Sequence, residues 1–221
     1  MHVLLIDDHE LVRVGLRTLV QELAPGSVVT EASSCEHALD LTGEPADLIL
    51  LDMMLPGANR LDAFDQIRLA FDSARIVAIS GINDPTLIYK TLQRGASGFV
   101  LKSYDNQITL SALRQVLVGG IHIPPEVLRF ATQTDPPPVA TRSVNDALRD
   151  LTDRQQDILF AAAIGQSNKV IARQFDIAEG TVKAHLAAVF SILDVKNRTQ
   201  ALLRIVGMSP SEVLDLRRRR D

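Results

Sequence analysis

Five polar side chains stand directly after short apolar runs in the first half of the chain. The carboxylates Asp7 and Asp8 follow one run, and Asp52 follows a second. The Ser80 hydroxyl and the Lys102 ammonium follow two more. Mg²⁺ prefers hard oxygen ligands, a carboxylate can attack phosphorus to give an acyl phosphate, and an ammonium neutralises charge on the transferring oxygens. These residue types together predict a site for a metal ion and a phosphoryl group.

The apolar runs before these residues predict buried strands. Each run is too short for a helix and lacks the polar alternation of a half-exposed strand. The runs cover residues 3–6, 48–51, 76–79 and 99–101, and a further strand is expected at 28–32. In an open parallel sheet, ligands bind beyond the carboxyl ends of the strands, so polar residues scattered over about a hundred positions would meet at one edge.

Helical patterns separate these strands. A stripe of apolar residues at helical spacing follows the first run, and a second helix has a cap, a favoured first residue and a stop signal. The stripe is Leu16, Leu19, Val20 and Leu23, and the second helix lies between Asp84-Pro85 and Gly95. Alternating strands and helices predict an α/β fold with a five-stranded, doubly wound parallel sheet of the flavodoxin-like type.

From about Met1 to Val118, the chain resembles the receiver domain of bacterial response regulators. The resemblance implies that Asp52 accepts a phosphoryl group from a partner histidine kinase. It also implies that Asp8, the Asp52 carboxylate and the backbone carbonyl of Met54 bind Mg²⁺ directly, and that Asp7 acts through water.

The same resemblance implies a conformational switch. It assigns Ser80 as the switch hydroxyl, Phe99 as the switch aromatic residue and Lys102 as the lysine that neutralises phosphoryl charge. A phosphoryl group adds up to two negative charges, which can draw the Ser80 hydroxyl inward and leave space for Phe99. Moving the equilibrium from mostly off to mostly on needs roughly 5 kcal/mol, which a few charge-assisted hydrogen bonds approach.

The composition is that of a two-domain protein. The chain has 221 residues, of which 46% are hydrophobic and 4% aromatic, and its single cysteine, Cys35, excludes an internal disulfide. No apolar stretch reaches the roughly 18 residues of a membrane span, and the chain starts without a basic, cleavable leader. We therefore expect a cytoplasmic protein without a membrane partner.

Charge and proline content divide the chain. Residues 1–130 have a net charge of −6 and residues 131–221 have a net charge of +2. A polar, proline-rich stretch lies between them, which is typical of a stiff linker. We predict a receiver domain at 1–120, a linker at 121–148 and a nucleic-acid-binding domain at 149–221.

The second domain has helical patterns only. Helix signals occur at 151–163, from Ser167, around Gly180-Thr181 and from Asn197-Arg198. Residues 151–205 resemble the LuxR-type helix-turn-helix, through the motifs Leu-Thr-x-Arg, Gly-x-Ser-Asn-Lys-x-Ile-Ala, Thr-Val-Lys-x-His and Asn-Arg-Thr-Gln-Ala. Joined to a receiver in this order, this small all-α domain resembles the NarL/FixJ class of transcription regulators.

The third of these helices divides into two faces. Val182, Leu186, Val189, Phe190 and Leu193 are expected to form its core face. Lys183, Ala184, Ala187 and Ser191 share another face, which would meet the major groove of double-stranded DNA. Alanines are also good helix formers, so Ala184 and Ala187 could serve only to stabilise the helix, and both interpretations stay open. The predicted phosphate contacts are Lys169, Thr181, His185 and Arg198, although His185 also fits a local structural role.

Three functions fit these features. The first is a transcription factor controlled by phosphorylation of Asp52, in which receiver pairing gives a homodimer. The second is a DNA-binding regulator that is independent of phosphate and has a vestigial receiver site. The third is a phosphatase working through an aspartyl phosphate, but such an enzyme would have a second carboxylate two residues past its nucleophile, where this chain has Met54. We therefore favour the first function and expect no enzymatic turnover.

Overall fold

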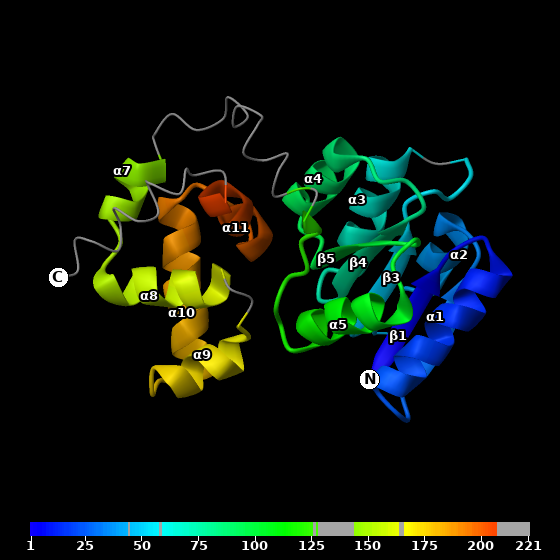
Figure 1. Cartoon of the computed structure of the whole chain (residues 1–221), viewed down its shortest axis with the longest axis horizontal. Helices are drawn as coiled ribbons and strands as arrows, with labels where there is room; N and C mark the ends of the chain where they lie inside the picture. Colours follow the sequence, from blue (N-terminus) through cyan, green and yellow to red (C-terminus); the bar gives the residue numbers. More distant parts are fainter. Residues whose placement is uncertain (44, 58, 126, 128–143, 164–165, 207–221) are drawn as a thin grey trace. The chain divides into compact units, whose positions relative to one another are not determined.

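The structure is a computed structural model, and it describes the chain except residues 44, 58, 126, 128–143, 164–165 and 207–221 (Figure 1). It divides into two compact units. The first unit comprises Met1–Leu117 and Ile121–Ile123, and the helices after residue 143 belong to the second. None of the described helices has the length and apolar character that crossing a membrane requires.

A five-stranded parallel sheet forms the centre of the first unit. The strand order is β2-β1-β3-β4-β5, which is the flavodoxin-like doubly wound order. The strands are β1 (His2–Ile6), β2 (Val28–Ala32), β3 (Leu48–Asp52), β4 (Arg75–Ser80) and β5 (Gly98–Leu101). Every residue of β3, in the middle of the sheet, is buried. The predicted strands and the predicted fold are confirmed.

Helices cover both faces of this sheet. They are α1 (Glu10–Leu23), α2 (Cys35–Asp40), α3 (Arg60–Ala70), α4 (Pro85–Gln93) and α5 (Asn106–Leu117). Helices α1 and α5 contact each other and enclose a core that includes Val3, Leu50 and Val77. Helix α3 contacts both α2 and α4, and these three lie on the other side of the sheet (Figure 1).

The helix signals in the sequence have the expected structural roles. In α1, Leu16, Leu19 and Val20 are buried, as the apolar stripe predicts. At the start of α4, the Asp84 side chain accepts a hydrogen bond from the Thr86 backbone N–H, which satisfies one of the donors that a helix N-terminus leaves without a partner. The stripe thus marks the buried face of α1, and the cap marks the start of α4.

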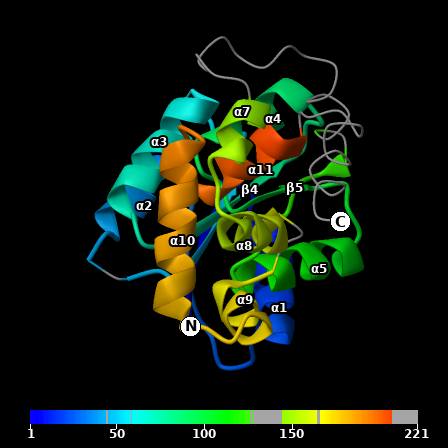
Figure 2. The same cartoon turned by 90° about the vertical axis from the view of Figure 1, so that its left-hand side faces the viewer.

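The second unit contains helices α7 (Val144–Arg149), α8 (Asp153–Ala163), α9 (Asn168–Gln174), α10 (Glu179–Ile192) and α11 (Arg198–Val206). Helix α10 is drawn in orange in Figure 2. It contributes to two apolar cores of this unit, through Val189 in one and through Val182 and Leu186 in the other. The Ser167 side chain caps α9 by accepting a hydrogen bond from the Val170 N–H. The all-helical second domain is confirmed.

Both ends of the predicted linker are structured. His122 forms an isolated parallel β-bridge with Gly98, and the His122 N–H donates to the Ser97 carbonyl at 3.1 Å. At the other end, α7 buries Ala147 and Leu148 in the helical core. The middle of the predicted linker, 128–143, and residues 207–221 of the predicted second domain lie outside the described residues, so the exact boundaries at 120 and 148 stay a prediction.

Candidate functional site

Two neighbouring strands position the carboxylates. Asp52 is the last residue of β3, and Asp7 and Asp8 follow β1 directly. The ladder between β1 and β3 pairs Ile6 with Leu51, so the residue after each lies at the same edge. Asp7 and Asp52 are 1% and 2% exposed, whereas Asp8 is exposed. We call these three residues the acidic cluster.

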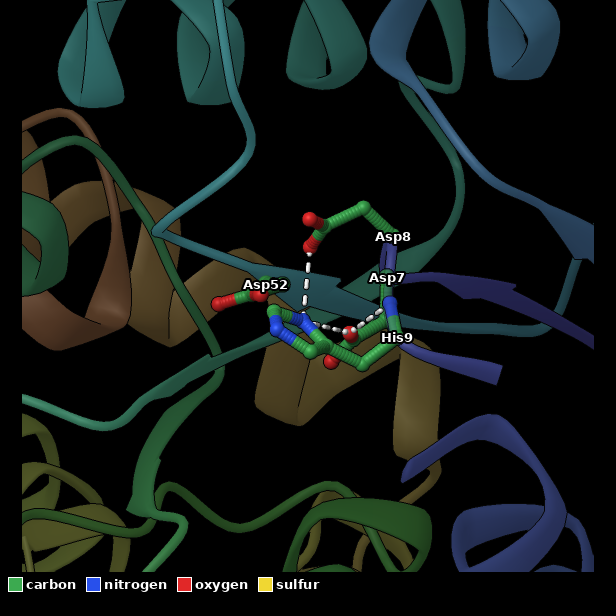
Figure 3. Close-up of side chains that lie close together, drawn as sticks. All are labelled: Asp7, Asp8, His9 and Asp52. Carbon is green, nitrogen blue, oxygen red and sulfur yellow. Dashed lines mark hydrogen bonds and ion pairs between the residues drawn. The ribbon is translucent and has the colours of Figure 1, made fainter. Parts of the chain in front are cut away.

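The loop backbones hold two of these carboxylates in place. Asp7 Oδ1 accepts a hydrogen bond from the His9 N–H at 2.9 Å, and Asp52 Oδ1 accepts one from the Met54 N–H at 2.9 Å. One ligand atom from each member of the acidic cluster and from His9 lies within 4.8 Å of the others (Figure 3). The predicted convergence of Asp7, Asp8 and Asp52 is therefore present in the structure.

Lys102 joins the two buried carboxylates. It follows β5, and its Nζ lies 2.8 Å from Asp7 Oδ2 and 2.8 Å from Asp52 Oδ2. Burial raises the pKa of Asp52, and the nearby charge of Asp7 raises it further, while the hydrogen bond from Lys102 opposes the rise. Burial alone would lower the pKa of Lys102, but its hydrogen bonds to Asp52 and Asp7 raise it. Lys102 is therefore held as a cation between two carboxylates.

The acidic cluster suits a hard divalent cation. Three carboxylates face one ammonium, so the site has an excess of negative charge that a cation would balance. Carboxylate oxygens are the ligands that Mg²⁺ prefers, and a Mg²⁺ site needs only one or two of them because the ion keeps several waters. The residues present fit that ion, and the Met54 backbone lies next to Asp52 through the hydrogen bond from its N–H.

Ser80 and Phe99 lie in two adjacent strands, β4 and β5. Ser80 ends β4, and its buried Oγ accepts a hydrogen bond from the Ile82 N–H at 3.0 Å and donates one to the Ile82 carbonyl at 3.2 Å. Phe99 lies in β5 opposite Ala78 and is fully buried. In this state the Ser80 hydroxyl is bonded within its own loop, and the Phe99 ring lies inside the protein.

Sequence reasoning missed His9. Its Nδ1 lies 2.9 Å from Asp8 Oδ1 and 3.4 Å from Asp7 Oδ1, and its side chain is largely exposed above the acidic cluster (Figure 3). The available signal was a histidine directly after two adjacent carboxylates. That signal is weak because the side chain of a loop residue can point in many directions before the tertiary structure selects one.

Helix α10 has the two predicted faces. Val182, Leu186 and Val189 are buried, Phe190 is half-buried, and Leu193, which caps the helix, is fully buried. The opposite face is exposed at Lys183, Ala184, Ala187 and Ser191. The predicted separation of core and surface is confirmed.

The predicted phosphate contacts lie in different environments. Lys169 in α9 and Thr181 in the first turn of α10 are exposed, and His185 is half-buried. Arg198, the first residue of α11, differs because its Nη2 donates to the Ala162 and Gln166 carbonyls, both at 2.6 Å. Burial lowers the pKa of the Arg198 guanidinium to about 10. Arg198 therefore has a structural role between α8 and α11, and its contact with a phosphate stays a prediction.

Two protein families match this chain. The family described as "Response regulator receiver domain" matches residues 3–114, and the family described as "Bacterial regulatory proteins, luxR family" matches residues 149–205. These ranges correspond to the α/β unit and to the helical unit, and the first of them contains the acidic cluster and Lys102.

Known proteins align with this chain over most of their length. The nitrate/nitrite response regulator protein NarL of Escherichia coli (strain K12) is 37% identical over 202 residues, which cover 90% of this chain and 92% of that protein. The glycerol metabolism activator of Pseudomonas putida is 35% identical over 205 residues, with 91% and 93% covered.

A solved structure matches more than half of this chain. A LuxR-family two-component response regulator from Aurantimonas sp. SI85-9A1 superposes with a TM-score of 0.52 at 32% identity and covers 58% of this chain and 92% of that one. The chain belongs to the two-component response regulators of the NarL/FixJ type, DNA-binding transcription regulators in which a receiver domain precedes a LuxR-type helix-turn-helix domain.

Proposed function

We propose that a sensor histidine kinase phosphorylates Asp52 and that this modification controls DNA binding. The observation that carries the proposal is the environment of the Asp52 carboxylate. It is buried at the carboxyl edge of the sheet, accepts a hydrogen bond from the Met54 N–H, and contacts the Lys102 ammonium beside Asp7. A nucleophile, a cation and further carboxylates thus share one small site.

The proposed reaction needs only the groups in this site and a phosphohistidine. An Oδ atom of Asp52 attacks phosphorus, the phosphorus–nitrogen bond breaks, and its electron pair leaves with the imidazole of the kinase. Mg²⁺, held by Asp8, Asp52 and the Met54 backbone carbonyl, with Asp7 acting through water, would neutralise charge on the phosphoryl oxygens. Lys102 supplies the same kind of neutralisation from the protein.

The acyl phosphate would change the partners of Ser80. Its hydroxyl exchanges its bonds with the Ile82 backbone for a charge-assisted bond to a phosphoryl oxygen, and Phe99 then occupies the vacated space. Hydrogen bonds to charged groups contribute about 1.5–3 kcal/mol each. Two or three of them therefore supply the roughly 5 kcal/mol that reverses a two-state equilibrium.

The direct test is the molar mass in solution. Light scattering in Mg²⁺, with and without beryllofluoride as a phosphoryl mimic, compares the wild type with Asp52→Asn. We expect the mass to double in the wild type only, because the modified receiver forms a homodimer. Asp40→Asn, which alters an exposed carboxylate at the end of α2, is the control and should behave as the wild type.

Two results would count against this proposal. If Asp52→Asn doubles its mass as the wild type does, Asp52 is not the switch. If beryllofluoride changes neither the mass nor the DNA affinity of the wild type, DNA binding is independent of phosphate.

For the DNA interface, we propose that α10 enters the major groove. Its exposed face carries Lys183, Ala184 and Ala187, where a lysine can donate to guanine and an alanine can contact a thymine methyl group. Lys169, Thr181 and His185 would bind phosphates. Arg198 would act mainly by positioning the helices, because its guanidinium already binds the carbonyl of Ala162 in α8 and that of Gln166 after α8.

Two lysine variants separate base reading from phosphate binding. We expect Lys183→Ala to cost about 1–3 kcal/mol at the preferred site and to relax specificity at one base pair. We expect Lys169→Ala to weaken binding equally on all sequences and to reduce the salt slope by about 1. Fluorescence anisotropy over a salt series on specific and random duplexes measures both. A uniform loss for Lys183→Ala would contradict its role in base reading.

A further inference from the structure

Arg13 lies outside the acidic cluster and binds the backbone of one of its members, Asp7. Arg13 lies in the first turns of α1, and its Nη1 donates to the main-chain carbonyl of Asp7 at 2.7 Å. The Arg13 side chain is only 15% exposed. The guanidinium therefore ties α1 back to the end of β1, across the loop that contains Asp7, Asp8 and His9.

A carboxylate on the neighbouring strand holds this arginine. Glu31 in β2 accepts a hydrogen bond from Arg13 Nε at 3.0 Å through its Oε2 and one from Arg17 Nε at 2.9 Å through its Oε1. Burial by itself raises the pKa of Glu31, but the hydrogen bonds from Arg17 and Arg13 outweigh it and lower the pKa. Glu31 is thus ionised and fixes the orientation of the planar Arg13 guanidinium.

The Asp7 main chain is consequently bound on both sides. Its N–H donates to the Ala32 carbonyl at 3.2 Å, and its carbonyl accepts from Arg13. The ladder between β1 and β2 ends where Ile6 pairs with Ala32, so Asp7 is the first residue beyond it. Beyond the end of this ladder, Arg13 binds the Asp7 carbonyl where the chain continues to Asp8, in addition to the bond that the His9 N–H donates to Asp7 Oδ1.

We infer that Arg13 and Glu31 are positioning residues that set the divalent-cation affinity of the acidic cluster. This inference rests on the proposed Mg²⁺ site. Neither side chain offers a ligand to the ion; Arg13 acts on the Asp7 backbone, and Glu31 acts on Arg13. Groups that bind a ligand must be held within about 0.5 Å of their productive geometry. Loosening the loop after β1 therefore spreads the Asp7 and Asp8 carboxylates over positions that bind the ion poorly.

The test is the affinity of the full-length chain for Mn²⁺, measured from the electron paramagnetic resonance signal of the free ion, with Mg²⁺ as competitor. We expect Arg13→Gln to weaken binding about tenfold, the lower end of the effect of groups that orient metal ligands. Glu31→Gln should also weaken Mn²⁺ binding. The double variant should resemble Arg13→Gln, because both substitutions act through one contact.

Arg68 provides a matched control. Its guanidinium also donates to backbone carbonyls, those of Ala74 at 2.9 Å and of Asp72, in the turn between α3 and β4. Arg68→Gln removes the same kind of contact away from the acidic cluster, so it should lower the melting temperature and leave the Mn²⁺ affinity unchanged. All affinities are measured where circular dichroism shows the variants fully folded.

The outcomes separate this inference from the proposed function. If the wild type binds Mn²⁺ no better than Asp8→Asn, the proposed metal site itself is wrong. If the wild type binds Mn²⁺ and Asp8→Asn does not, but Arg13→Gln and Glu31→Gln bind as the wild type, only the positioning role is overturned. Should Arg13→Gln fail to fold, Glu31→Gln decides, because it keeps the shape of the carboxylate and removes only its charge.

Discussion

The Asp52 carboxylate is ionised at a cost in stability. It is 2% exposed, its pKa is raised first by burial and then by Asp7, and Lys102 compensates only partly because it is shared between both carboxylates. The folded protein therefore holds the Asp52 proton more tightly than the unfolded chain does. The cost is absent at low pH and grows as the pH rises above the ordinary value of 3.8 for this group.

Asp52→Asn should therefore stabilise the metal-free protein. The amide keeps an oxygen for the Met54 N–H and removes the buried charge, so we expect a higher free energy of unfolding at pH 7. Thermal unfolding between pH 4 and pH 8 should show that the difference in stability between Asp52→Asn and the wild type increases with pH. Asp40→Asn, on the surface, should show no such trend.

Addition of Mg²⁺ should reduce or reverse this difference. We expect the ion to bind the folded wild type more tightly than the variant, because Asp52→Asn removes a carboxylate of the proposed Mg²⁺ site, and a ligand stabilises the state that it binds. Lower stability of Asp52→Asn without Mg²⁺ would show that the ion pair with Lys102 outweighs the cost of burial.

Helix α10 combines a well-packed centre with a weak first turn. Its core face is buried, but its N-cap is Ala178, whose side chain makes no capping hydrogen bond. Gly180 follows in the first turn, where a Cβ would meet no atom within 4 Å. Backbone donors at this end thus lack the side-chain acceptor that Ser167 provides for α9.

Ala178→Ser should raise the melting temperature of the helical domain. A serine at an N-cap contributes about 0.5–2 kcal/mol, because its hydroxyl accepts a hydrogen bond from the first turn. Differential scanning calorimetry of the full chain measures the change. Ala184→Ser, which places the same residue on an exposed part of α10, should be neutral or slightly destabilising. Equal effects of the two substitutions would contradict the capping explanation.

As a whole molecule, the protein joins two units of different charge and composition. Residues 1–130 have a net charge of −6, and residues 131–221 have a net charge of +2. A single small helix-turn-helix module binds DNA weakly, and two modules linked through paired receivers gain from their effective concentration. The proposed pairing of the receivers would thus be sufficient to change the affinity for DNA without a change inside the helical unit.

The DNA selected by the activated protein should contain two related half-sites. Selection from random duplexes with beryllofluoride-loaded protein should return half-sites whose centres lie about 10 base pairs, or a multiple of this, apart, because both recognition helices must face the same side of the duplex. Adding five base pairs between them should abolish the gain in affinity. Equal affinity for an isolated half-site would show that the protein acts on DNA as a monomer.

The fold and the three residues of the acidic cluster could be predicted from the amino-acid sequence. Buried parallel strands are continuous apolar runs, so their ends, and the polar residues that follow them, were visible at Asp7, Asp52 and Lys102. Helix periodicity likewise predicted which side of α10 is buried. The short helix α7 was missed, since its six residues are too few to show a helical period.

Contacts between side chains and groups far apart in the chain could not be predicted, because they depend on how the helices and strands pack. Arg13 and Glu31 pair across 18 positions of the chain, and Arg198 reaches carbonyls 32 and 36 positions earlier, as a consequence of how α1 lies beside β2 and how α11 lies beside α8. Long side chains on a surface have many rotamers, and packing of the elements selects one. Periodicity records which face of an element is buried, but not which side chains of another element that face will meet.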